Sequence, residues 1–223
     1  MTNNIWNTPY SSANGQLLIG KNSNSPNWTT ITQGTGTTIT SGAGSITINF
    51  AAATEKDFVL LSTVTASSSA SITFTGLSST YSIYMIDIYK IDPVDANVFL
   101  YMRTSTNNGS SYDNGASDYR WDMYYAEAIL GITSLNDTAD AQIRLAGDIG
   151  AGLNNQGSGT VWLFQPSNAD YAKIYCRYKN STTDETFYSS GMRLAAADVD
   201  AIQFFMSSGN ILTGIFKLYG LKA

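Results

Sequence analysis

The chain has 223 residues, of which 43% are hydrophobic and 13% are charged, and it carries a formal net charge of −5. This length suits one sandwich domain with an appendage. The acidic balance leaves no basic patch of the kind that binds a phosphate backbone, so we expect no nucleic-acid partner. The sequence contains no histidine, which excludes Ser-His-Asp and Cys-His hydrolases and removes the commonest metal ligand.

No membrane-spanning segment or internal disulfide is expected. No stretch approaches the roughly 18 apolar residues needed to cross a bilayer, and the start MTNNIWNTPY lacks the regions of a signal peptide. The single cysteine, Cys176, falls in an alternating run over residues 172–178. This position favours a buried small hydrophobe over the alternative, a reactive thiol.

Residues 1–55 predict an extended, strand-containing arm. Asn, Thr, Ser and Gly dominate this stretch, and its apolar residues are too few for an independent core. We therefore expect it to be ordered against a neighbour and to serve in anchoring and oligomerisation. The candidate anchoring residues are Ile5, Trp6, Leu17, Leu18, Ile19, Trp28 and Ile31.

Residues 14–48 carry a first resemblance to a known family. They read NGQLLIGKNSNSPNWTTITQGTGTTITSGAGSITI. This segment resembles a linker of phage tail fibres and related virion proteins, in which a GQLLIG turn precedes a Thr- and Gly-rich strand pair that ends in SITI. The resemblance spans some thirty positions in a fixed order.

Residues 56–223 show short strands bounded by turn residues, which is the pattern of sandwiches and barrels. We predict an all-β fold: an antiparallel, jelly-roll-like β-sandwich of about 8–10 strands that follows the N-terminal arm. Strands are expected at residues 72–74, 81–91, 98–103, 142–145, 160–164, 172–178, 202–206 and 215–218.

Three segments of this domain need separate interpretation. The run at residues 81–91 is apolar on both parities, which predicts a central strand covered on both faces. Two Asn-Gly steps within residues 107–115 predict a hairpin or a long loop. Residues 118–130 fit one or two strands or a short helix, and alanines in residues 194–199 predict one or two helical turns.

A second resemblance lies in the same domain. Its segments read SSTYSIYMIDI, FLYMRTSTNNGSSYDNGASDYRW and DVDAIQFFMSSGNILTGIFKLYGLKA. They resemble a domain found at the carboxyl ends of phage virion proteins, both in distal parts of tail fibres and tailspikes and in stand-alone head decoration proteins. With the linker, the resemblance covers nearly the whole chain, and it supplies no catalytic residues.

The resemblance implies a homotrimeric β-sandwich of a virion, made in the cytoplasm of a bacterial host. We expect a non-enzymatic capsid decoration (cement) protein on the outer capsid surface, whose arm holds the shell of major capsid protein. The alternative is a receptor-binding domain at the tip of a tail fibre or tailspike. Taken without the resemblance, the composition of the arm indicates that the chain forms an oligomer or binds a partner, and it does not indicate a three-fold symmetry.

Aromatic residues, at 12% of the chain, suggest one binding site. A loop with exposed rings beside Asn and Asp could contact a host-surface glycan. The alternative is that most rings fill the core or a subunit interface. The candidate glycan-contact residues are Tyr112, Asp113, Asn114, Tyr119 and Trp121.

The Asp and Glu residues of the chain give no reason to expect an enzyme or a bound cofactor. A depolymerase would need a catalytic carboxylate pair, but the chain has three glutamates and its aspartates fall mostly in turns. Two sets of oxygen ligands fit calcium in type, although neither matches a twelve-residue calcium loop. These sets are Asp92, Asp95 and Asn97, and Asp113, Asn114 and Asp118.

Overall fold

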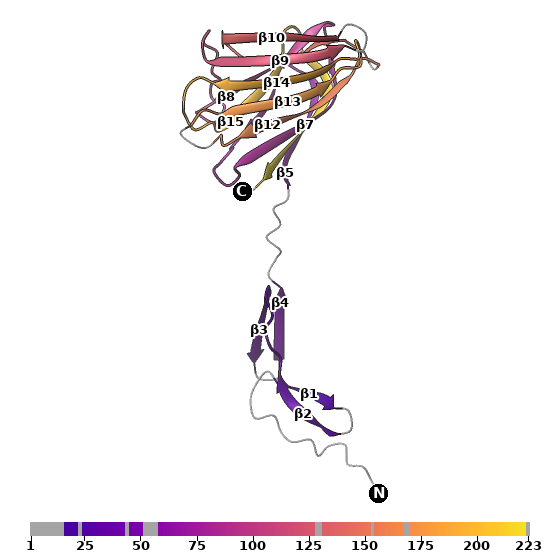
Figure 1. Ribbon diagram of the computed structural model, residues 1–223, viewed down its shortest axis with the longest axis vertical. Helices are drawn as coiled ribbons and strands as arrows, with labels where there is room; N and C mark the ends of the chain where they lie inside the picture. Colours follow the sequence, from indigo (N-terminus) through magenta and orange to yellow (C-terminus); the bar gives the residue numbers. More distant parts are fainter. Residues whose placement is uncertain are drawn as a thin grey trace. The chain divides into compact units, whose positions relative to one another are not determined.

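The computed structural model describes residues 16–21, 24–42, 45–50, 58–127, 131–152, 154–166 and 170–221. The chain divides into two compact units, Met1–Glu55 and Lys56–Ala223 (Figure 1). The regular structure of the described residues is strand throughout, which confirms the all-β prediction. Within these ranges, no helix is long and apolar enough to cross a membrane.

The N-terminal unit contains two antiparallel hairpins. Strand β1 (Gln16–Lys21) pairs with β2 (Asn24–Thr30), and β3 (Thr37–Gly42) pairs with β4 (Ser45–Phe50). Alternating Thr and Ile favour strands in β3 and β4, because branched side chains fit a pleated surface. A two-stranded hairpin is only marginally stable by itself in water.

The residues predicted to anchor this unit are distributed over its first hairpin and beyond. Leu17, Leu18 and Ile19 lie in β1, Trp28 lies in β2, and Ile31 follows β2, while Ile5 and Trp6 lie outside the described residues. Leu18 and Trp28 are cross-strand partners, so the hairpin register places their backbones side by side.

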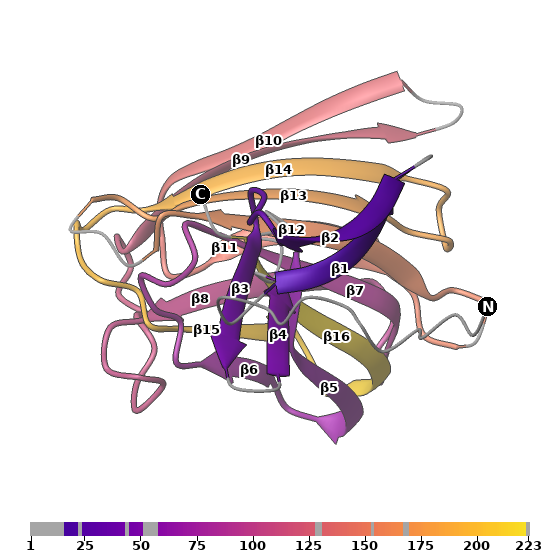
Figure 2. The same cartoon turned by 90° about the horizontal axis from the view of Figure 1, so that it is seen from below.

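The second unit is a sandwich of two antiparallel sheets (Figures 1 and 2). The large sheet has the order β10 (Gly131–Asp140), β9 (Tyr119–Glu127), β14 (Thr186–Arg193), β13 (Lys173–Lys179), β12 (Gly157–Phe164), β7 (Ile83–Pro93), β16 (Ile211–Leu221) and β5 (Val59–Ser69). The small sheet has the order β11 (Ile143–Ile149), β8 (Val98–Ser105), β15 (Ala201–Met206) and β6 (Ile72–Thr75).

The strand order is that of a jelly roll with two additions. The order β5-β16-β7-β12 stands against β6-β15-β8-β11, which is the pairing expected of an eight-stranded jelly roll. Strands β9 and β10 are inserted between β8 and β11, and β13 and β14 between β12 and β15, and all four extend the large sheet. The described part of this unit therefore has twelve strands rather than the predicted 8–10.

The core lies between the sheets and follows from strict alternation. In β13, Ile174, Cys176 and Tyr178 are buried, while the intervening Tyr175 and Arg177 face outward. Rings from the two sheets meet in the middle, for example Phe204 and Phe216 with centroids 5.6 Å apart. Each large side chain buried in this way stabilises the fold by about 1.5–3 kcal/mol.

The predicted helical turns at residues 194–199 are wrong. The segment is irregular, because its amides bond to distant carbonyls instead of to the preceding turn. The amide of Leu194 donates to Asp118 O at 2.7 Å, and that of Val199 donates to Pro166 O at 2.7 Å. Val199 is fully buried, so tertiary packing overrides the helix propensity of the neighbouring alanines.

Strand β7 is central in the large sheet, as predicted, but it is covered on one face, by the small sheet, and not on both. Its inward residues, such as Ile86 and Ile88, are buried, whereas Tyr89 is exposed. The open alternatives for other segments are also resolved: residues 119–127 form a strand, and residues 106–118 form a long loop between the two sheets.

Candidate binding surface

Tyr119, predicted to contact a glycan, belongs to the core. It begins β9 on the inner face of the large sheet and is 0% exposed. Its hydroxyl accepts a hydrogen bond from the amide of Thr104 at 2.8 Å and donates to the carbonyl of Asp113 at 3.2 Å. Burial raises the pKa of this phenol to about 12. The ring is therefore not free to stack on a sugar.

Trp121 is the second ring of the predicted set, and it is 9% exposed. Its indole Nε1 donates a hydrogen bond to Asp140 Oδ2 at 2.8 Å, at the end of β10. Tyr112 is half-buried and Asn114 is exposed, both in the loop between β8 and β9. The structure thus separates the predicted set: Tyr119 is a core ring, Trp121 is largely buried but also lines a cleft of the large sheet that is described below, and Tyr112, Asp113 and Asn114 lie in the loop.

The aspartates considered as calcium ligands are engaged in turn and ion-pair contacts. Gly152 N–H donates to Asp92 (2.7 Å), Ser208 O–H to Asp95 (2.6 Å) and Gly115 N–H to Asp118 (2.6 Å), and Arg193 forms a salt bridge with Asp113 (2.6 Å). Asn97 adopts a left-handed backbone with φ of 58°, as Asn does in turns. Within the described ranges, no group of three or more His, Cys, Asp or Glu residues could hold a metal ion.

Cys176 is buried, which confirms the small-hydrophobe interpretation. Its thiol lies on the inner face of β13, among the residues of the core. Burial raises its pKa to about 12, and a hydrogen bond with Ser189 opposes part of that rise. Because the thiolate is the nucleophile, this cysteine is unreactive in the folded chain near neutral pH.

The outer face of the large sheet carries a connected set of aromatic side chains. Tyr124 and Tyr188 stack with ring centroids 5.0 Å apart. On the neighbouring strands, Phe164 meets Tyr175 edge to face at 5.5 Å and lies 6.5 Å from Trp162. These residues come from β9, β14, β13 and β12, and they share one face because each occupies the outward parity of its strand.

One part of this outer face is apolar. Cross-strand register aligns Trp162 with Met85, Met85 with Tyr219, and Tyr219 with Leu60. Phe58 reaches the same area, with its ring centroid 5.5 Å from that of Trp162. We call Phe58, Leu60, Met85, Trp162 and Tyr219 the apolar patch. Leu60 and Phe58 are exposed, and the other three are partly buried.

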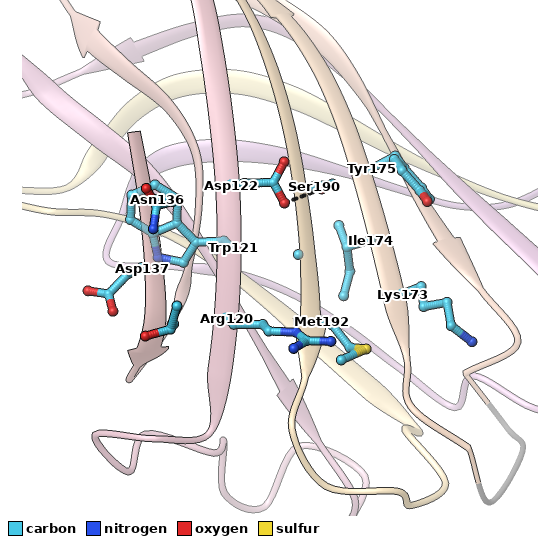
Figure 3. A pocket seen from close by; sticks show the side chains of 12 residues that line it. Arg120, Trp121, Asp122, Asn136, Asp137, Lys173, Ile174, Tyr175, Ser190 and Met192 are labelled. Carbon is cyan, nitrogen blue, oxygen red and sulfur yellow. Dashed lines mark hydrogen bonds between the residues drawn. The ribbon is translucent and has the colours of Figure 1, made fainter. Parts of the chain in front are cut away.

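The other part of the outer face combines rings with charges, and it is hollowed. A cleft of about 380 Å³ is lined by residues of β9, β10, β13 and β14 (Figure 3). Its hollow follows from the register, because the small Ser190 lies between Asp122 on one side and Tyr175 on the other. We call it the mixed cleft and define it by Arg120, Asp122, Lys173, Tyr175, Ser190 and Met192.

Some polar side chains of the mixed cleft are held by hydrogen bonds or ion pairs, and others keep hydrogen-bonding capacity for a ligand. Ser190 Oγ donates to Asp122 Oδ1 at 2.8 Å, as the dashed line in Figure 3 shows. Lys173 Nζ is 3.3 Å from Asp170 Oδ2 in an exposed ion pair. Arg120, which lies beside its cross-strand partner Met192, forms no salt bridge with any described residue.

A second hollow of about 410 Å³ adjoins the mixed cleft and shares Asp122, Tyr175 and Ser190 with it. It adds the stacked Tyr124 and Tyr188 pair and Arg177, whose guanidinium carbon lies 5.6 Å from the Tyr188 ring centre. Sequence reasoning named one residue of this surface, Trp121 of the mixed cleft, and missed the others. Its signal was the outward parity of residues 173–179, which carries Lys, Tyr, Arg and Lys in alternation with core residues.

The comparisons with known proteins leave the family open. No protein-family model matches the chain, and no curated protein matches it. Among solved structures, the chain is similar to fructofuranosidase from Schwanniomyces occidentalis in complex with fructose, at 9% identity and a TM-score of 0.33. A variant of that enzyme in complex with fructosylnystose gives 9% identity and a TM-score of 0.31. Each match covers 93% of this chain and 39% of the other chain, and likeness at this level carries no functional argument.

Proposed function

We propose that the protein is a non-enzymatic bacteriophage virion protein, a homotrimeric capsid decoration protein on the outer surface of the head. The observation that carries this proposal is the architecture: a jelly-roll sandwich follows a separate unit of two hairpins. This is the order expected from the two sequence segments that resemble phage linkers and distal domains. Jelly rolls recur in viral capsids, which supports the same proposal at the level of the fold.

The apolar patch supports self-association. Phe58 and Leu60 are exposed and continue into the partly buried Trp162 and Met85. Contiguous apolar surface of this kind is typical of interfaces, because leaving it in water forgoes the hydrophobic free energy of burial. We assign the contact between copies to this patch. The number of copies, three, comes from the family resemblance.

The N-terminal unit is suited to binding an assembled shell. Lys21 is the one charged residue among residues 1–50, so strand edges here carry little charge that would repel another β-strand. Because isolated hairpins are marginal, an ordered neighbour would stabilise them, and binding to the assembled shell alone would in turn stabilise the shell. The neighbour that we propose is the major capsid protein.

Immunogold labelling of purified particles tests the location. We expect label over the head surface, and we expect sedimentation velocity of the isolated full chain to show a trimer. Label confined to tail tips would instead establish the alternative, a receptor-binding domain of a tail fibre or tailspike. Shortening of host polysaccharide by the pure protein would contradict the non-enzymatic assignment.

A further inference from the structure

The mixed cleft and the adjoining hollow bring together three kinds of group. The ring of Tyr175 is 54% exposed, and that of Tyr124, in the adjoining hollow, is 48% exposed. Between them, Asp122 offers acceptor oxygens, and Arg120 and Arg177 offer donors. Within the described part of the chain, neither arginine has a salt-bridge partner. The two hollows, of about 380 and 410 Å³, are each large enough for a small-molecule site.

This combination discriminates between classes of ligand. The cleft offers a purely anionic ligand no net attraction, because the charges of Asp122 and Asp137 cancel those of Arg120 and Lys173. A purely apolar ligand would strip water from Arg120 and Lys173 without replacing their hydrogen bonds. A carbohydrate meets neither difficulty, because its hydroxyl groups donate as well as accept and its C–H faces can lie on an aromatic ring.

We propose that the mixed cleft and the adjoining hollow bind an oligosaccharide. The Tyr175 ring supports the apolar face of one sugar residue, while Asp122 accepts and Arg120 donates hydrogen bonds at its hydroxyl groups. The stacked Tyr124 and Tyr188 pair, with Arg177 beside it, forms a second subsite for the next residue of the chain. The shared residues Asp122, Tyr175 and Ser190 make the two subsites continuous.

A second copy of this chain is the competing occupant, and the charges favour the sugar. Arg120, Asp122 and Lys173 would each have to be paired or desolvated in a protein interface, whereas the apolar patch offers a surface without those costs. The inference deepens the host-surface contact of the proposed virion protein. It concerns the sandwich alone, so it is independent of whether the chain sits on a head or on a tail.

The test is binding of the full chain to an array of bacterial surface polysaccharides and their oligosaccharide fragments, followed by calorimetric titration of the glycans retained. We expect Tyr175→Ala to weaken binding and raise the dissociation constant about tenfold or more, as truncation of a central aromatic contact does. Tyr175→Phe keeps the ring and should stay within about threefold of the wild type. The matched control is Tyr89→Ala, which removes an outward tyrosine, 41% exposed, that lines neither hollow.

Three outcomes would overturn the inference. The first is an array on which the wild type and Tyr175→Ala give the same signals. The second is equal weakening by Tyr175→Ala and Tyr89→Ala, which would indicate a nonspecific effect of lost surface rings. The third is a Tyr175→Ala protein that sediments as a smaller species and binds no glycan, which would assign the cleft to a contact between copies. Particle labelling is unaffected by any of these results, so failure of the glycan site and failure of the virion assignment are distinguishable.

Discussion

The two faces of the large sheet both carry aromatic side chains, but the fold accounts for one set alone. In β13, Tyr178 faces the small sheet and is fully buried, while Tyr175, three residues earlier, is 54% exposed. Burial explains the inner rings, because each stabilises the native state. It does not explain the outer rings, which rest on no second layer within the described part of this unit. The difference indicates that the exposed aromatic residues of the outer face serve a purpose other than folding of the sandwich.

The largest expected effect separates the faces at two adjacent residues of β14. Phe187 is fully buried, so Phe187→Ala should lower the free energy of unfolding by about 3–5 kcal/mol through the cavity it leaves. Tyr188 faces outward and stacks on Tyr124, so Tyr188→Ala should cost about 0.5–1.5 kcal/mol. Urea denaturation of both variants measures the difference. Equal losses would show that the outer rings are also structural.

Alkaline pH should destabilise the folded state through the buried thiol of Cys176 on the inner face. Burial raises the pKa of its thiol from 9.0 to about 12, so the folded state holds a proton that the unfolded state releases. Stability is therefore complete below about pH 9 and falls as pH rises toward 12, by about 1.4 kcal/mol per pH unit and about 4 kcal/mol in all. Tyr119, raised from 10.0 to about 12, adds a loss that begins near pH 10.

Urea midpoints measured between pH 8 and pH 11 test this sign. In the wild type the midpoint should begin to fall near pH 9, whereas in Cys176→Ala the fall should begin near pH 10, where Tyr119 starts to contribute. Coincident curves for the two proteins would contradict the role given to the thiol.

The apolar patch gives a sharper contrast within the outer face itself. Leu60→Asp places a carboxylate where we expect two copies to meet, so self-association should weaken about a hundredfold, or ~3 kcal/mol. Tyr89→Asp is the matched control, because Tyr89 is exposed on the same face and lies outside the apolar patch. Sedimentation velocity over a range of concentrations distinguishes them. An unchanged sedimentation coefficient for Leu60→Asp would move the interface elsewhere.

Local sequence pattern was sufficient for much of the fold. Alternation identified Ile72 and Phe74 in β6 and the core residues of β13, because a half-buried strand has a period of two. Strand β10 was missed because it is almost wholly exposed and Ile132 and Leu135 set no alternation, and β14 because Ser189 and Gly191 occupy inward positions where an apolar residue was expected. Strand β5 was also not among the predicted strands.

The candidate site was less accessible to sequence reasoning. Turn signals directed attention to residues 107–115, whereas the mixed cleft depends on register. The hydrogen bond from Ser190 to Asp122 joins residues 68 positions apart, and nothing local to either residue indicates it. Trp121 was predicted as a glycan contact and lines the mixed cleft, and Tyr175 gave a further signal as the outward aromatic residue of an alternating run.

The smallest expected effect concerns a polar atom on the inner face. The hydroxyl of Tyr178 is buried and has no hydrogen-bond partner among the described residues, and burial holds the pKa of this phenol well above its usual value. Removing an unpaired buried hydroxyl relieves its desolvation cost, so Tyr178→Phe should leave stability unchanged or raise it by up to about 1 kcal/mol. Chemical denaturation at pH 7 measures the change. A loss of stability would contradict this account and show that the hydroxyl makes a contact that stabilises the inner face.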